Sequence, residues 1–211
     1  PHKTVVMNTD NLREAVCHDY VCAEYKNHYR NGENFISADC LPVDCDNDHS
    51  EDPNDWVTPA DVLEAFPGVS IAIHYSRFNN REKNGKPARP KFHVLFPIDR
   101  MTDATLYSDM KKLVNSIFPY FDTKALDAAR FFFGTQEPNV ELYPGRMNLT
   151  EFLNDDEFDA GLPGGHKKDA VIPEGSRNAV MSRFAGIVIK KYGDSEKAYQ
   201  SFLEKAATCV P

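Results

Sequence analysis

The segment from Lys91 to Ile98 constrains the fold more than any other part of the chain, because it has the two-residue period of a β-strand. Its apolar face would consist of four side chains: Phe92, Val94, Phe96 and Ile98. Lys91 and His93 would lie on the opposite face, since neighbouring side chains of a strand point to opposite sides. We therefore expect a β-sheet with one face buried against the core and a second face that presents an ammonium and an imidazole.

Further strands and helices follow from apolar periodicity and from helix-capping residues. Strands are expected at 35–46, with an interruption at Pro42, and at 70–78, 130–133 and 140–143. Helices are expected at 10–29 with Asp10 as the N-cap, from Thr58 to about 66, and at 103–118. The apolar face of the last helix would consist of Leu106, Met110, Leu113, Val114 and Ile117. The mixture of elements predicts the α+β class.

A segment rich in Gly, Pro and Lys, residues 155–175, divides the chain and predicts a linker. Two short helices are expected after it, at 177–191 and 195–207. We therefore expect residues 1–165 to form one α+β domain, and residues 166–211 to comprise the linker and a small helical C-terminal module.

The composition is that of a globular protein. Of 211 residues, 41% are hydrophobic and 27% are charged, which is enough apolar material for a core. No stretch approaches the roughly 20 apolar residues of a membrane span, and the first ten residues have no apolar signal-peptide region. The five cysteines show no regular spacing, which favours a reducing compartment over a disulfide framework. We expect a cytoplasmic protein without a membrane partner.

Charge is distributed unevenly along the chain. The formal net charge is −8, yet residues 67–100 contain seven Lys or Arg and only two Asp or Glu. A basic middle inside an acidic chain suits either a solvated surface or a local site for a polyanion.

Two carboxylates, Asp44 and Asp46, lie two residues apart in the expected strand at 35–46. They would lie on one face, about 7 Å apart along the backbone, where their side chains can converge on divalent metal ions. Cys45 would point into the core. A plain acidic turn is the alternative. An EF-hand loop is disfavoured, because His49 and Asp55 occupy the positions that need Gly and Glu.

Two further groups suit phosphate chemistry. Lys91 and His93 on one strand face can hold a triphosphate, the ammonium as a point charge and the imidazole as a directional donor. Asp127 and Arg130 precede a very apolar segment, where a carboxylate can act as a third metal ligand beside a phosphate contact. Surface pairs of Lys with His, or of Asp with Arg, are the alternatives.

The order of these motifs resembles the archaeo-eukaryotic primase superfamily, specifically the primase-polymerase (prim-pol) domain of plasmid, phage and mobile-element replication proteins. The resemblance covers residues 10–150 and rests on LPVDCDNDH at 41–49, RPKFHVLFPID at 89–99 and LDAARFFFG at 126–134. The tail EGSRNAVMSRFAGIVIKKYG, residues 174–193, resembles the helical primase C-terminal module that often follows such domains.

The resemblance implies a role for each matching residue. Asp44, Asp46 and Asp127 match catalytic acids that hold two Mg²⁺ or Mn²⁺ ions, and His93 matches the nucleotide-binding histidine. The position of Lys91 is often Ser in the family, so a phosphate contact there would be ionic. Arg130, Ser76 and Arg77 are further candidates for binding nucleotide or template.

The resemblance also implies an RRM-like antiparallel sheet with an additional small α/β part. It implies transfer of nucleotides from NTP or dNTP to a 3′-hydroxyl along a single-stranded DNA template. A helicase domain downstream of this chain is a further expectation.

Two other classes are weighed against this interpretation. A replication-initiator nickase also uses an RRM-like sheet, but it needs paired histidines on a strand and a tyrosine nucleophile. A non-catalytic nucleic-acid-binding module needs exposed aromatic side chains on its central strands, whereas Phe131 to Phe133 are expected in the core. Zinc binding through Cys17, His18, Cys22, Cys40 and Cys45 is not expected, because their spacing is not that of a zinc finger.

Overall fold

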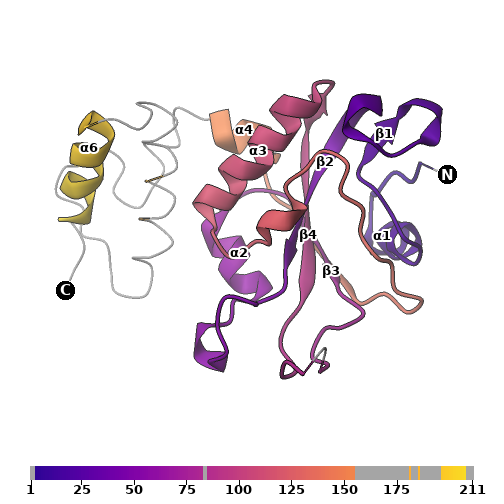
Figure 1. The fold of residues 1–211 in the computed structure, drawn as a ribbon, viewed down its shortest axis with the longest axis horizontal. Coiled ribbons are helices and arrows are strands. Elements are labelled where there is room, and N and C mark those ends of the chain that lie inside the picture. Colours follow the sequence, from indigo (N-terminus) through magenta and orange to yellow (C-terminus); the bar gives the residue numbers. More distant parts are fainter. Residues whose placement is uncertain (1–2, 83–84, 155–180, 182–184, 186–195, 208–211) are drawn as a thin grey trace.

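The computed structural model describes residues 3–82, 85–154, 181, 185 and 196–207. Within this part of the chain, five strands form one antiparallel sheet in the order β1-β2-β4-β3-β5 (Figure 1). The strands are β1 (Ala23–Tyr25), β2 (Phe35–Cys45), β3 (Ile71–Tyr75), β4 (Phe92–Met101) and β5 (Val140–Tyr143). The α-helices are α1 (Thr9–Val16), α2 (Pro59–Ala65), α3 (Ala104–Ile117), α4 (Leu149–Asn154) and α6 (Glu196–Ala206). The α+β prediction is therefore confirmed.

Helix-capping residues fix the starts of α2 and α3 where the sequence predicts them. The Asp61 carboxylate accepts hydrogen bonds from the backbone N–H and the hydroxyl of Thr58, each at 2.7 Å. The Asp103 side chain accepts from the backbone N–H groups of Thr105 and Leu106. These bonds satisfy donors that the first helical turn leaves without intrahelical partners.

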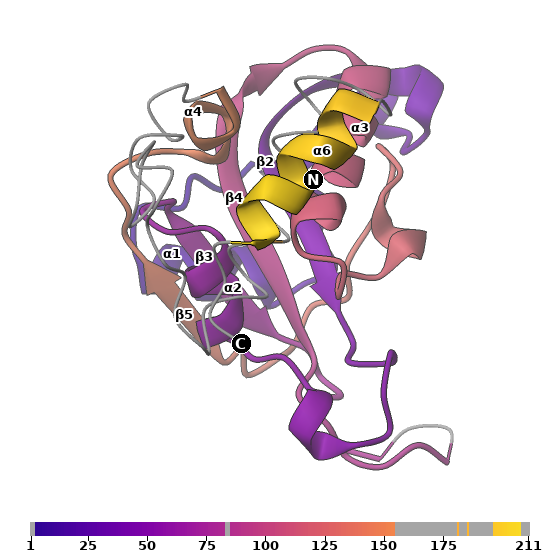
Figure 2. The same cartoon turned by 90° about the vertical axis from the view of Figure 1, so that its left-hand side faces the viewer.

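The sheet has two different faces, as the alternation in β4 predicts. One face forms the main core under α2 and α3 with Leu41, Val43, Cys45, Ile71, Ile73, Phe92, Val94 and Phe96. The opposite face carries a smaller apolar cluster under α1, formed by Leu12, Val16, Ala72, Leu95 and Val140. Figures 1 and 2 show this layering, with α2 and α3 on one side of the sheet and α1 on the other.

The predicted helix at 10–29 is wrong in its length and its cap. The helix α1 begins at Thr9, with Asn8 as the N-cap, and ends at Val16. Ala23–Tyr25 pairs with β2, and Tyr20 forms a β-bridge with Phe132. Long-range strand pairing therefore prevails over the local helical periodicity.

Three other predictions also need correction. Residues 130–133 are not a strand of the sheet; only Phe132 forms a bridge, and Phe133 is 47% exposed, so these phenylalanines are not all in the core. Leu106 is exposed on α3, whose buried positions are taken by Tyr107, Lys111, Val114 and Ile117. The predicted interruption at Pro42 is also wrong, because β2 continues through this residue. Pro42 lies beyond Ala38, where the pairing of β2 with β1 ends, so its missing N–H leaves no partner on β1 without a donor.

The C-terminal predictions are tested only in part. The second of the two expected helices is confirmed as α6. The linker at 155–175 and the boundary at 165 lie outside the described residues, as does the expected helix at 177–191 apart from residues 181 and 185. Among the residues that the structure describes, no helix is long and apolar enough to cross a membrane.

Candidate functional site

Three polar side chains form a row across the three central strands of the sheet, one residue from the end of each strand. The registers align Asp44 of β2 with His93 of β4, and His93 with His74 of β3. The flanking residues Val43 and Cys45 are fully buried in the main core, so the row lies on the opposite face. Antiparallel pairing thus brings together residues that are up to 49 positions apart.

Asp44 is a buried carboxylate next to other carboxylates. Its side chain is 13% exposed. Burial raises the pKa of Asp44 to about 7, and the negative charges of Asp46 and Asp122 add to the shift, whereas Arg130 and Lys91 oppose it. Near neutral pH this group is therefore poised between its acid and its carboxylate, and an additional positive charge beside it would favour the carboxylate.

Lys91 neutralises the second carboxylate of the pair. Its Nζ lies 3.0 Å from Asp46 Oδ1 and donates a hydrogen bond to the Asp46 carbonyl oxygen, also at 3.0 Å. Lys91 is only 4% exposed, whereas the Asp46 side chain is 30% exposed, so the pair lies at the boundary between the protein interior and solvent. The sequence predicts Lys91 on the sheet face beside His93; the structure shows that its charge is directed to the end of β2.

The turn after β2 is held by a buried arginine. Arg89 is fully buried and donates to the carbonyl oxygens of Asn47 and Ser50 and to the carboxylate of Glu51. The Asn47 amide in turn donates to the Pro90 carbonyl oxygen at 2.8 Å. These bonds link the residues that follow Asp46 to those that precede Lys91, and so fix the Asp46–Lys91 pair.

A hydrogen-bonded network extends from His93 to the other side of the row. The Tyr20 hydroxyl lies 3.0 Å from His93 Nδ1 and 3.1 Å from His74 Nδ1, and the two Nδ1 atoms are 3.3 Å apart. His74 Nε2 lies 3.2 Å from Thr135 Oγ1. Both rings are kept neutral, because burial lowers the pKa of His93 to about 3 and that of His74 to about 4.

Neutral rings restrict the tautomers in this network. The Tyr20 hydroxyl oxygen and the two Nδ1 atoms all have hydrogen-bond partners when the Tyr20 hydroxyl donates to one Nδ1 and the other Nδ1 donates to the hydroxyl oxygen. With the His93 Nδ1 as the acceptor, His93 Nε2 carries the proton and points toward Asp44 Oδ1, 3.7 Å away. His74 Nε2 then accepts from Thr135. Neither Tyr20 nor His74 was expected at this site, because neither residue lies in one of the three motifs and Tyr20 is far from Asp44 and His93 in the sequence.

Arg130 adds a positive charge to the row. It lowers the pKa of both Asp44 and His93, so its guanidinium acts on both groups. Its Nε atom is buried and has no hydrogen-bond acceptor among the described residues. A buried donor without an acceptor is costly, so a bound anion would be favourable there.

Asp127, the predicted third acid, has other neighbours. Its carboxylate accepts from the Ala129 backbone N–H, and its carbonyl oxygen accepts from the buried Lys111 ammonium. Asp122 is the acid of this segment that acts on Asp44, and its backbone N–H donates to the Asp44 carbonyl oxygen at 2.7 Å. Asp122 was not among the acids expected at the site, although it lies only five residues before Asp127.

Ser76 and Arg77 follow the end of β3. The Ser76 backbone N–H donates to the Lys91 carbonyl oxygen, and its hydroxyl accepts from the Phe78 N–H. The Arg77 guanidinium lies 4.1 Å from the centre of the Phe133 ring. The two residues are therefore near the Lys91 end of the sheet, and their side-chain partners are Phe78 and Phe133 rather than Asp44.

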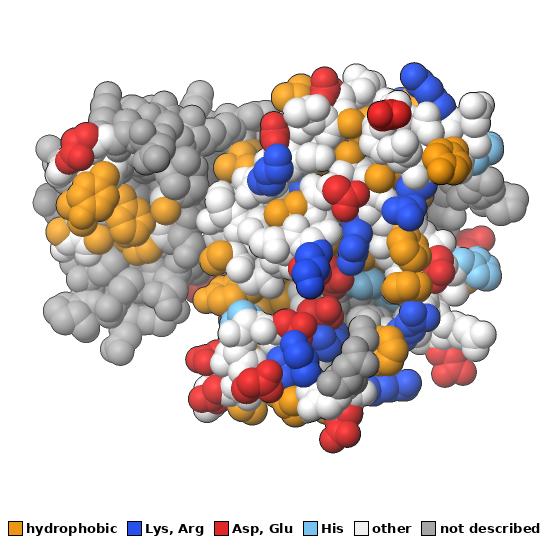
Figure 3. All heavy atoms as spheres, in the orientation of Figure 1, with side chains coloured by type: hydrophobic (Ala, Val, Ile, Leu, Met, Phe, Trp, Pro, Cys, Tyr) orange, Lys and Arg blue, Asp and Glu red, His pale blue; other side chains and the backbone are white. Residues whose placement is uncertain are grey.

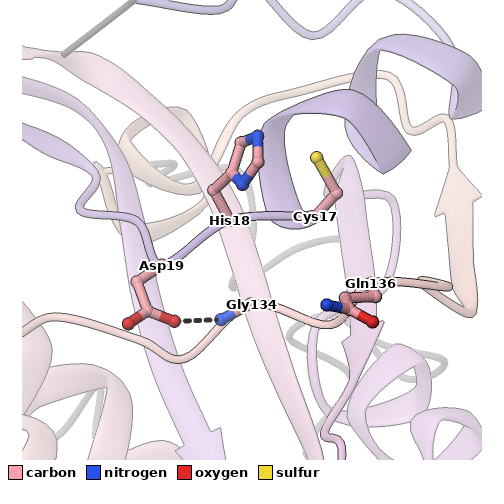
Figure 4. A pocket seen from close by; sticks show the side chains of 5 residues that line it. All are labelled: Cys17, His18, Asp19, Gly134 and Gln136. Carbon is pink, nitrogen blue, oxygen red and sulfur yellow. Dashed lines mark hydrogen bonds between the residues drawn. The ribbon is translucent and has the colours of Figure 1, made fainter.

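A pocket separate from this row of side chains lies between the end of α1 and the segment after Phe133. A cavity of about 500 Å³ is lined by Cys17, His18, Asp19, Gly134 and Gln136 (Figure 4). The Asp19 carboxylate accepts from the Gly134 N–H, which ties the two walls together. Gly134 is required, because a Cβ there would lie 2.1 Å from the His18 carbonyl oxygen.

Metal ligands are few in the part of the chain that the structure describes. No group of three or more His, Cys, Asp or Glu side chains is arranged to hold a metal ion in those residues. Cys17, Cys22, Cys40 and Cys45 are free thiols. Asp44 and Asp46 thus supply two carboxylate ligands, and the other ligands of a metal ion would include water or substrate.

Comparisons with protein-family models, with curated proteins and with solved structures find no match for this chain.

Proposed function

We propose that this chain is a template-directed nucleotidyltransferase of the primase-polymerase type. It would transfer a nucleotide from NTP or dNTP to a 3′-hydroxyl opposite a single-stranded DNA template. The observation that carries the proposal is the Asp44–Asp46 pair beside Lys91, His93 and Arg130. Acids that suit metal ions and cations that suit phosphates thus meet at one end of three adjacent strands.

The strand order supports an RRM-like sheet. The chain runs from β2 through α2 to β3 and then to β4, and β4 lies between β2 and β3. This is a split βαβ arrangement, from which ferredoxin-like sheets are built. The correspondence covers these three strands only: β5 pairs with β3, whereas the fourth strand of a ferredoxin-like sheet pairs with the first, and β2 is flanked by β1 instead.

The donor set fits Mg²⁺ or Mn²⁺. Both prefer oxygen ligands, and Mg²⁺ is usually bound by one or two carboxylates together with substrate phosphates and water. Asp44 and Asp46 would hold the ions, with Asp122 or Asp127 as the candidate third acid. Bound there, the ions would neutralise charge on the transferred phosphoryl group.

The remaining groups would bind and orient the nucleotide. The unpartnered Arg130 Nε suits a phosphate oxygen, and the His93 Nε2–H is a neutral directional donor. Lys91 is already paired with Asp46, so its main effect would be to fix that carboxylate. The expected split of roles is that Arg130 and His93 set nucleotide affinity, whereas Asp44 and Asp46 set the rate.

A nickase is the second candidate, and one observation favours it. The structure brings together two histidines and a tyrosine, the residue types that this chemistry needs: His74, His93 and Tyr20. The tyrosine hydroxyl, however, is hydrogen-bonded to both rings, and burial raises its pKa well above the usual value. Both features oppose its action as a nucleophile.

One assay separates these functions. The protein is incubated with a labelled primer on a template, dNTPs or NTPs, and Mg²⁺ or Mn²⁺, and then again without the primer. We expect extension that Asp46→Asn reduces at least 100-fold, and that Asp109→Asn, a matched exposed acid on α3, leaves unchanged. Cleavage of a single strand without extension would favour the nickase. Neither activity, with a folded protein, would refute both proposals.

A further inference from the structure

The segment from Arg130 to Phe133 has two different sides. Phe132 is buried and stacks on Tyr20 with ring centres 5.6 Å apart, and it contacts the His93 ring edge-on at 4.8 Å. Phe131 and Phe133 point the other way and contact each other with ring centres 4.7 Å apart. This is the alternation of an extended chain, so one short segment serves both the site and the surface.

Two arginines from distant parts of the chain lie against these outer rings. Arg77 lies over Phe133 at 4.1 Å, and Arg30 lies over Phe131 at 5.0 Å. Arg30 also donates a hydrogen bond to the Ala129 carbonyl oxygen, which fixes it along the segment. We call Arg30, Arg77, Phe131 and Phe133 the aromatic–arginine patch.

The patch is accessible. Phe133 is 47% exposed and Phe131 is half-buried, and both arginine side chains reach solvent. On the face of the molecule that Figure 3 presents, hydrophobic, basic and acidic side chains are interspersed. A large aromatic ring that stays exposed gains little for folding, because its apolar area is not removed from water.

The local charge suits a polyanion. Arg77 belongs to residues 67–100, which contain seven Lys or Arg and two Asp or Glu. Two carboxylates border the patch, Asp19 and Asp127, and each accepts a backbone N–H bond from the 129–134 segment. Within the patch itself the charged groups are the guanidinium groups of Arg30 and Arg77, and both side chains are exposed.

We propose that the aromatic–arginine patch binds single-stranded DNA next to the catalytic site. Unpaired bases would stack on Phe131 and Phe133, and the guanidinium groups of Arg30 and Arg77 would contact the phosphates. The identification of this strand as the template rests on the proposed function. Because Phe132 contacts His93, a base on the patch would lie one residue away from the groups that hold the nucleotide.

Binding is measured by fluorescence anisotropy with a fluorescein-labelled 15-nucleotide oligo(dT), in EDTA and without nucleotide. The test variant is F131L/F133L, which keeps apolar bulk but removes both aromatic faces, and F131Y/F133Y restores them. We expect the Kd of the leucine variant to rise about tenfold or more, and that of the tyrosine variant to stay within about threefold of the wild type. Leu106→Ala, an exposed apolar side chain on α3, is the matched control.

The arginine contribution is measured by salt dependence. Arg77→Ala should reduce the slope of log Kd against log salt concentration by about 0.7, as expected for the loss of one phosphate contact to a single strand. Arg100→Ala, whose side chain is 63% exposed on β4, should leave the slope unchanged. Arg77 is on the surface, so this variant also tests the patch if the phenylalanine variants do not fold.

Three results would overturn the proposal: a Kd for the folded leucine variant within twofold of the wild type, an unchanged salt slope in Arg77→Ala, or equal competition by a 15-base-pair duplex, whose bases cannot stack on the rings. The assay needs no turnover, so it is separable from the proposed function. Strand binding through the patch without primer extension would refute that function and keep the patch. Primer extension by the wild type, together with unaltered strand binding in F131L/F133L, would support the proposed function and refute the role of the patch.

Discussion

Replacing Asp44 by Asn should stabilise the folded protein while it abolishes activity. The carboxylate lies on the sheet with 13% of its side chain exposed, next to the negative charges of Asp46 and Asp122. Ionised Asp44 therefore costs folding free energy at neutral pH, and the neutral amide of similar shape does not carry this cost.

The magnitude follows from the raised pKa. A shift from the ordinary 3.8 to about 7 means that the folded protein binds a proton more tightly than the unfolded chain between these pH values. The stability of the wild type therefore falls as pH rises through this window. At about 1.4 kcal/mol per pKa unit, the cost is about 1 kcal/mol at pH 4.5 and about 4 kcal/mol at pH 8.

The assay is urea denaturation of the wild type and Asp44→Asn at pH 4.5, 6 and 8, in EDTA so that no divalent cation is bound. We expect the variant to be more stable by up to about 4 kcal/mol at pH 8, with a difference that shrinks as the pH falls. Asp109→Asn, which removes an exposed acid that pairs with Lys112, should change stability by less than about 0.5 kcal/mol at every pH.

The reasoning would be refuted if Asp44→Asn were equally or less stable than the wild type at pH 8, or if the difference did not depend on pH. Either result would mean that the negative charges around Asp44 are already compensated inside the protein. In that case a bound cation would no longer be favoured by uncompensated negative charge at Asp44, and this support for the proposed nucleotidyl transfer would be lost.

Other parts of the site give further expectations. Tyr20→Phe removes the hydroxyl that bonds both Nδ1 atoms and should cost about 1–2 kcal/mol in urea denaturation; a ¹⁵N NMR spectrum of the imidazoles should then show a changed tautomer ratio for His93, and an unchanged ratio would refute the tautomer assignment. Because burial lowers the pKa of His93 to about 3 and that of His74 to about 4, the unfolded chain binds more protons, and stability should fall by about 2 kcal/mol per histidine between pH 7 and pH 5. This is measured in the Asp44→Asn background; a flat profile would contradict it. Gly134→Ala should destabilise the fold by at least about 1–3 kcal/mol, since its Cβ would lie 2.1 Å from a backbone oxygen, and an unchanged melting temperature would show that the cavity wall yields.

The main features of the sheet could be predicted because they depend on local patterns. The alternation of Phe92, Val94 and Phe96 indicated the buried face of β4 before any partner strand was known, and Thr58 marked the start of α2. The Asp44–Asp46 spacing likewise placed two carboxylates at the end of one strand. Each of these patterns lies within about ten residues of sequence, where backbone geometry alone decides which side chains share a face.

The residue types of the site could be predicted from the sequence, but the partners of their side chains could not. Lys91 was expected to serve a triphosphate, but its ammonium is paired with Asp46. The negative charge of Asp122, rather than that of Asp127, raises the pKa of Asp44, because the backbone N–H of Asp122 is hydrogen-bonded to the Asp44 carbonyl oxygen in β2. Which acid of a segment approaches a strand depends on how that segment docks, and no local spacing encodes this.

The sequence by itself determined the buried face of β4, the capped start of α2 at Thr58 and the residue types that meet at the end of β2 and β4. Only the tertiary structure decided that Tyr20 leaves the predicted helix to bridge Phe132, and that its hydroxyl joins His74 to His93. It also decided that Phe133 faces solvent beside Arg77 rather than the core. The physical reason is that strand pairing and burial are contacts between distant segments, and their free energies exceed the weak local preferences that a sequence pattern reports.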